Sequence, residues 1–205
     1  MLGIQHNADE YLKRLQRELG RVDRAEVSRL AELIYEAWEN GQSVFIFGNG
    51  GSGATASHLC EDLNKNAIRE ADLKGEAPRR PRVMSLTDNT SWITAIGNDL
   101  GFEQIFVQQL MHLARPGDLV VAISGSGNSP NVLAAVDWAN QHGLKTFGIT
   151  GYDGGRLKTV QQAGIHVPLD DMGMVESIHL SLGHWLVDDL HARVNRTGRY
   201  GSAEE

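Results

Sequence analysis

Short apolar runs alternate with helical patterns along most of this chain, and this alternation restricts the fold more than any other feature of the sequence. Residues 44–47 (VFIF) and 119–123 (LVVAI) are apolar at every position, as expected of strands buried on both faces of a parallel sheet. Helical spacing of apolar residues follows each run. Because strands that alternate with helices form parallel sheets with right-handed crossovers, the pattern predicts a doubly wound α/β domain.

The predicted sheet has five parallel strands with helices between them. Strands are expected at residues 44–47, 83–86, 119–124, 146–150 and 165–167. Helices are expected at residues 54–66, 91–96, 102–113, 129–142, 156–163 and 174–194. The polar, proline-containing segment 67–82 interrupts this rhythm and is expected to be a surface excursion over the site.

Three regions are expected along the chain. Residues 1–40 are predicted to form an N-terminal helical arm, residues 41–196 the α/β domain, and residues 197–205 a disordered tail. Gly20 and a candidate N-cap at Asp23 predict that the arm is two helices or one kinked helix. The pattern leaves two arrangements open, since such an arm packs either on its own core or against a partner subunit.

Composition and charge exclude several classes of protein. The 205 residues are 41% hydrophobic and 22% charged, with a net charge of −7, which argues against a nucleic-acid-binding surface. No apolar run approaches the ~20 residues of a membrane span, and the N-terminus lacks the apolar core of a secretory signal. The single cysteine, Cys60, excludes an intrachain disulfide. We therefore expect a cytoplasmic protein that binds neither nucleic acid nor membrane.

The loop after the first strand, GNGGSG at residues 48–53, matches the glycine pattern of dinucleotide-binding folds. Such a fold needs an acidic residue ~20 positions later, at the end of the second strand, to hold the ribose hydroxyls. Asp72 has about that offset, but it lies in the polar segment before any second strand. The dinucleotide interpretation is therefore disfavoured.

Three predicted strand ends instead combine hydroxyl residues or glycines with a following helix: residues 48–53, 87–91 (TDNTS) and 124–129 (SGSGNS). Any one of these loops could serve only to cap its helix. Three such loops at one edge of the sheet instead favour a site that binds a phosphate monoester through free N–H groups and hydroxyls. No Walker-type lysine follows, which disfavours a nucleoside triphosphate. The candidate substrate- and phosphate-binding residues in these loops are Asn49, Gly50, Gly51, Ser52, Thr87, Asp88, Asn89, Ser124, Ser126 and Ser129.

Acidic residues and histidines at helical spacing suggest a metal or acid–base site. His58 and Asp62 are four residues apart and share one helix face, with Glu61 as an alternative partner of His58. On the last predicted helix, Glu176 and His184 are eight residues apart. The closer pairs there are Glu176 with His179 and His184 with Asp188, and spacing alone does not choose among them.

Four segments together resemble the sugar isomerase (SIS) domain family, and within it the phosphoheptose isomerases: GNGGSGATASHLCEDL, SLTDNTSWITAIGND, VVAISGSGNSPNVLAAVDWA and GITGYDGG. The resemblance extends over about residues 43–194. It implies a flavodoxin-like sheet and a homo-oligomer, commonly a tetramer. It also implies aldose–ketose isomerisation through an enediol, with sedoheptulose 7-phosphate converted to D-glycero-D-manno-heptose 7-phosphate.

The same resemblance implies a Zn²⁺ site at His58, Asp62, Glu176 and His184, with Asp62 as base and His184 as acid. Glu176 is also a candidate contact to the substrate. The family's usual Glu and Gln are replaced by Asp62 and Glu176, but both remain oxygen ligands, so an N₂O₂ set still suits zinc.

Other departures from the family pattern bear on the substrate. Met174 and Val175 stand where relatives carry an Arg, and Asn66 stands where many carry another. These differences, with the long segment 67–82, leave open an isomerase or lyase of another phosphosugar. A different class of function, a non-catalytic regulator that binds a phosphosugar and a protein partner such as a replication-initiation factor, is the other alternative.

Overall fold

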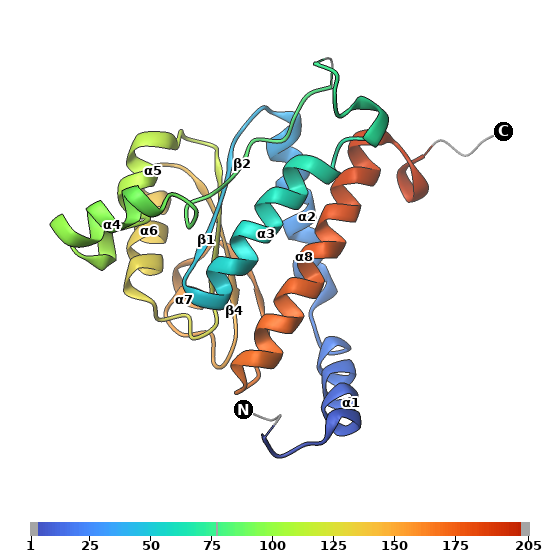
Figure 1. Cartoon of the computed structure of the whole chain (residues 1–205), viewed down its shortest axis with the longest axis vertical. Helices are drawn as coiled ribbons and strands as arrows, with labels where there is room; N and C mark the ends of the chain where they lie inside the picture. Colours follow the sequence, from blue (N-terminus) through green and yellow to red (C-terminus); the bar gives the residue numbers. More distant parts are fainter. Residues whose placement is uncertain (1–3, 77, 202–205) are drawn as a thin grey trace.

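Alternate residues of the central strands face opposite sides of a five-stranded parallel sheet, with strands in the order β2-β1-β3-β4-β5 (Figure 1). The computed structural model describes residues 4–76 and 78–201. The strands are β1 (Val44–Gly48), β2 (Val83–Ser85), β3 (Leu119–Ser124), β4 (Lys145–Thr150) and β5 (Ala163–His166). The predicted doubly wound sheet is confirmed, and the chain reverses its direction of winding between β1 and β3.

Two separate cores lie on the two faces of the sheet. Val44 and Ile46 of β1 point into one core, and Phe45 and Phe47 point into the other. The first core is covered by α2 (Arg24–Glu39), α3 (Gly50–Asn66) and α8 (Met172–Asn195). The second is covered by α4 (Thr90–Asp99), α5 (Val107–Leu113), α6 (Pro130–Gln141) and α7 (Leu157–Val160). This two-sided burial explains why the strands have no polar alternation.

The N-terminal arm consists of two helices, α1 (Ala8–Leu19) and α2, which is one of the two forms that the sequence predicts. Asp23 is the N-cap of α2, and its side chain accepts a hydrogen bond from the Ala25 N–H at 2.8 Å. Leu30 and Ile34 of α2 are fully buried, so this helix packs on the chain's own sheet. In contrast, α1 extends beyond the sheet and leaves Leu12 exposed (Figure 1).

Several predicted boundaries shift. The helix expected from residue 54 begins at Gly50, because its glycines carry no side chains that could reveal helical periodicity. The pattern at 102–113 divides into a 3-10 helix, η3 (Phe102–Gln104), and α5. The helix expected at 156–163 is only α7, since β5 already begins at Ala163.

The polar segment 67–82 is largely exposed, as the sequence predicts. It does not lie over the three loops at residues 48–53, 87–91 and 124–129, called the phosphate-type loops below, so it does not cover that part of the expected site (Figure 1). It includes η2 (Glu70–Asp72) and starts where α3 ends, ~25 Å along that helix from the β1 loop. Arg79 donates to the Glu39 carbonyl at the end of α2, and Trp38 Nε1 donates to the Arg79 carbonyl at 3.0 Å. The segment thus caps helix ends on the far side of the molecule.

Part of the predicted tail contacts α8. Residues Gly198–Tyr200 form η4, and the Tyr200 hydroxyl donates to Oδ1 of the buried Asp189 at 3.0 Å. Residues 202–205 lie outside the described residues. Along the described residues 4–76 and 78–201, we find no helix with the length and apolar character that crossing a membrane requires.

A buried histidine lies where α8 crosses β4. His179 is 3% exposed, and its Nε2 lies 3.3 Å from the Thr150 carbonyl, while its Nδ1 has no hydrogen-bond partner. Burial, with a smaller contribution from the nearby His166, lowers the pKa of His179 to about 4. The folded chain therefore holds this imidazole neutral at pH values where an exposed histidine is protonated.

We predict that this histidine makes the fold sensitive to acid. Because the unfolded state binds the proton near pH 6.5 and the folded state only near pH 4, its contribution to stability is present above pH 6.5 and is lost as the pH falls. The free energy of unfolding should drop by about 3 kcal/mol between pH 7 and pH 4 on account of this group. Urea unfolding at several pH values measures this, and His179→Gln should remove that part of the slope. An equal slope in both proteins would contradict the assignment.

Candidate active site

The three phosphate-type loops meet at the carboxyl edge of the sheet, as the parallel topology requires. Of the two neighbouring helices that start there, α3 has no side-chain cap on its first N–H groups. In contrast, α6 begins with Pro130, which has no N–H, and its Val132 N–H donates to Asn131 Oδ1 at 2.9 Å. The four helices α1, α2, α4 and α8 are all capped by an Asn or Asp side chain. Free N–H groups at the positive end of a helix can bind an anion, so the start of α3 is compatible with the phosphate site that the sequence predicts, and that site stays a prediction.

Hydroxyl groups line the loop between β3 and α6. Ser124 is buried, and its Oγ accepts from the Gly127 N–H at 3.1 Å and lies 3.2 Å from Ser129 Oγ. Ser126 is exposed, and its Oγ accepts from the Asn128 N–H at 3.2 Å. This loop and the loop after β4 fix one another, because the Leu157 N–H donates to the Gly127 carbonyl at 2.9 Å.

The β1 loop is fixed by an amide pair that the sequence analysis missed. Asn49 and Asn131, from the first turn of α6, exchange two hydrogen bonds of 2.9 and 2.8 Å between their side chains. Asn131 is 1% exposed. Nothing in the local sequence marks it, because its partner is 82 positions away. Gly50 follows at a φ of 53°, and Ser52 is buried in the first turn of α3.

The β2 loop contributes side chains that mostly hold the structure together. Asn89 caps α4 by accepting from the Trp92 N–H at 3.1 Å, and Asp88 accepts from the Ser57 hydroxyl on α3. Thr87 differs from these two, because its buried Oγ1 has no hydrogen-bond partner. A substrate contact from Thr87, Asp88 or Asn89 remains a prediction.

The first turn of α8 packs directly on glycines of these loops. A Cβ on Gly51 would overlap the Glu176 carboxylate, and a Cβ on Gly125 would lie 2.5 Å from Met172 Sδ. The glycines therefore allow α8 to approach the sheet edge. Glu176 is placed beside the β1 loop, where it lines a cavity of about 300 Å³ with Gly51, Thr55 and His58.

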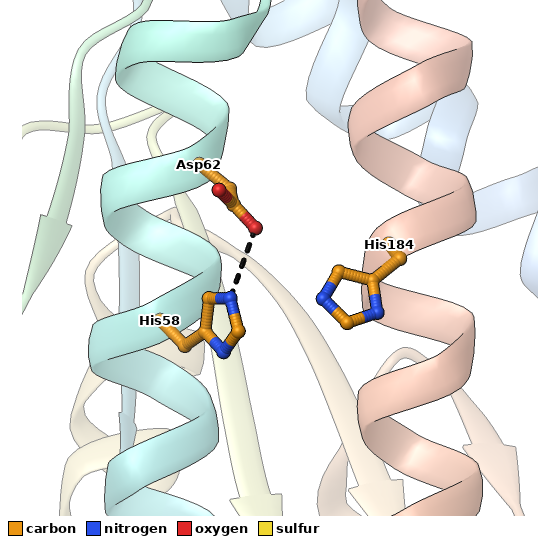
Figure 2. A group of neighbouring side chains, drawn as sticks. All are labelled: His58, Asp62 and His184. Atoms are coloured by element: carbon orange, nitrogen blue, oxygen red, sulfur yellow. Dashed lines mark ion pairs between the residues drawn. The ribbon is translucent and has the colours of Figure 1, made fainter.

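His58, Asp62 and His184 come together between α3 and α8 (Figure 2). One ligand atom from each residue lies within 4.8 Å of the other two, and His58 Nε2 is 3.2 Å from Asp62 Oδ2. The His58 and His184 rings lie edge to face with centroids 5.2 Å apart. Asp62 has only 15% of its side chain exposed, compared with 46% for His58. Two imidazoles and a carboxylate that converge on one point fit the ligand preferences of zinc.

The fourth predicted ligand, Glu176, is not part of this group of three. It lies eight residues, ~12 Å along the helix, before His184, and faces the cavity that His58 also lines. Of the pairs that spacing left open, the structure joins His58 to Asp62. His179 points instead to Thr150 in the core.

These features match known proteins. A model of the SIS domain family matches residues 9–151. A phosphoheptose isomerase from Geotalea daltonii is 39% identical over 182 residues, covering 89% of this chain and 91% of that one. One from Trichlorobacter lovleyi is 43% identical over 164 residues, covering 80% of each. The solved structure of phosphoheptose isomerase from Neisseria gonorrhoeae has a TM-score of 0.77 at 30% identity, covering 86% of this chain and 91% of that one. The chain therefore belongs to the SIS domain family.

Within that family, the similarity to phosphoheptose isomerases covers most of both chains. The chain is, like them, an isomerase. The resemblance inferred from the sequence motifs is confirmed.

Gly127 gives a direct test of how the hydroxyl loop is held. Its φ is 66°, and an added Cβ would overlap the Gly154 carbonyl. Gly127→Ala should destabilise the fold by about 1–3 kcal/mol beyond the effect of Gly41→Ala and should weaken substrate binding, because the loop must move. Gly41 is the matched control, since its φ is 68° but a Cβ there meets no atom within 4 Å. Urea unfolding compares the two variants, and equal losses of stability would contradict the steric argument.

Proposed function

We propose that this chain interconverts sedoheptulose 7-phosphate and D-glycero-D-manno-heptose 7-phosphate by aldose–ketose isomerisation. The observation that carries the proposal is that α3 serves both parts of such a reaction. Its uncapped N-terminus lies in the phosphate-type loops, and His58 and Asp62 follow in its middle turns. His58 is ~9 Å along the helix from Ser52, a length that an extended sugar phosphate spans.

The loops supply binding and orientation. The hydroxyl groups of Ser52, Ser124, Ser126 and Ser129, with that of Thr87, hold the phosphate together with the uncapped N–H groups at the start of α3. Asn49 and Glu176 contact the sugar chain. Because the phosphate is remote from the reacting carbons, its binding energy serves to place those carbons beside Asp62 and His184.

Proton transfer is assigned to the cluster between α3 and α8. Asp62 removes the proton from the carbon next to the carbonyl, and His184 exchanges protons with the sugar oxygens, giving an enediol. His58, Asp62 and His184, with Glu176 as a fourth ligand, would hold Zn²⁺, which stabilises negative charge on the sugar oxygens as a Lewis acid. Glu176 is the alternative base, since a metal-bound Asp62 would be less basic.

The oligomeric state and the location of the protein in the cell are also proposals. From the resemblance of its motifs, we propose a homotetramer that acts in the cytoplasm. Neither property enters the assignment of the residues above.

Proton NMR of sedoheptulose 7-phosphate with the purified chain in D₂O tests the function. We expect new heptose 7-phosphate signals with deuterium at C2, loss of turnover on chelation, and recovery with zinc. Turnover that is unchanged by the chelator would support the isomerase activity and contradict the role of zinc. A chain that binds zinc without product or exchange would act on another phosphosugar. Absence of both zinc binding and turnover would favour a non-catalytic regulator.

We predict that Asp62→Asn lowers kcat by about 10³-fold, because the amide cannot accept the proton, while affinity for the sugar phosphate changes little. Glu61→Gln is the matched control, because Glu61 is a neighbouring carboxylate on the same helix whose Oε1 lies 3.9 Å from Lys65 Nζ. Steady-state kinetics and calorimetric titration of the sugar phosphate measure the two effects. Near-normal turnover in Asp62→Asn would contradict this assignment and show that another residue is the base.

A further inference from the structure

The Asp62 carboxylate has a separate partner for each oxygen. Oδ2 lies 3.2 Å from His58 Nε2, facing the gap toward His184 (Figure 2). Oδ1 accepts a hydrogen bond from Asn66 Nδ2 at 2.8 Å. Asn66 is the last residue of α3, one helical turn after Asp62, so its amide reaches the side of the carboxylate that faces away from His58.

The main chain at Asn66 is itself held by α8. His191 Nδ1 lies 2.7 Å from the Asn66 carbonyl oxygen, and Asn195 Nδ2 donates to the next carbonyl, that of Ala67, at 2.9 Å. His191 and Asn195 are 7 and 11 residues after His184, so all three lie on one face of α8. The helix that carries His184 therefore also fixes the position from which the Asn66 amide donates.

We propose that Asn66 is a positioning residue for Asp62. Its amide occupies Oδ1 and leaves Oδ2 directed at His58 and His184, so that Asp62 offers one oxygen to a metal or a substrate proton. This inference rests on the proposed function, in which Asp62 is ligand and base. A neutral amide suits the role, since it orients the carboxylate while leaving its negative charge unpaired by a cation.

Without the amide, the Asp62 carboxylate is free to rotate about its last side-chain bond. Either Oδ1 or Oδ2 could then point toward His58 and His184. The effect should therefore appear in metal binding and in the chemical step. The phosphate-type loops at the other end of α3 should not respond, because Asn66 contacts none of them.

Asn66→Ala is the test, with Lys65→Ala as the matched control on the same turn. Alanine favours a helix more than asparagine does, and the main-chain bonds to His191 and Asn195 do not need the side chain. Competition with a chelating dye measures zinc affinity, which should fall about 10- to 100-fold in Asn66→Ala and stay unchanged in Lys65→Ala. The visible spectrum of the Co²⁺-loaded protein should change with it. We expect kcat to fall while KM and the melting temperature of the metal-free protein stay at wild-type values.

Equal zinc affinity, Co²⁺ spectrum and kcat in the two variants would overturn the proposal. So would a general loss in Asn66→Ala that includes KM and melting temperature, because this would mean a purely structural role. If the wild-type chain turns over substrate but binds no zinc, kcat alone is the test: a lower kcat in Asn66→Ala than in Lys65→Ala supports the proposal, and equal values overturn it. A wild-type chain that does neither refutes the proposed function and this inference together, whereas a functional wild type with matching variants refutes the inference alone.

Discussion

The packing of α3 against α8 is the contact on which the site depends. Leu59 and Leu63 of α3 are buried in the same core as Ile178 and Leu186 of α8. Gly183 of α8 faces Leu59 across this contact, since a Cβ placed there would lie 3.6 Å from the leucine side chain, an ordinary van der Waals distance. His58 and Asp62 flank these leucines and lie at the solvent-facing rim of the seam, opposite His184. Hydrophobic burial thus supplies the geometry, and the polar groups need only occupy neighbouring positions.

The parallel sheet supplies the second half of the site. All strand ends lie on one edge, where the direction of winding reverses between β1 and β3, and this brings the N-termini of α3 and α6 together. Since α3 lacks a side-chain cap, its first N–H groups and the positive end of its dipole would stabilise a negative charge there. In the proposed function, the one helix α3 therefore links an anion-binding end to a middle that carries His58 and Asp62.

Much of this was predictable from local patterns. The five strands follow from apolar runs that only a two-sided core tolerates, and the His58–Asp62 pair follows from helical spacing. For the segment 67–82 the sequence predicted the exposure but not the position, because its charges indicate a surface location without indicating which surface. The sequence also did not identify the Asn49–Asn131 pair or the hydrogen bond from Asn66 to Asp62, since hydrogen bonds between distant segments, and the direction of an exposed amide, leave no periodic signal.

The sequence by itself therefore determined the class of fold, the edge at which the loops meet and the chemical types of the site residues, because these depend on periodicity and on the direction of parallel strands. Tertiary structure alone decided which residues converge. It joined His184 to His58 and Asp62 across two helices, and it placed Glu176 beside the β1 loop, outside that group. The physical reason is that helix packing sets these distances through buried side chains such as Leu59 and Leu186, which lie more than a hundred residues apart along the chain.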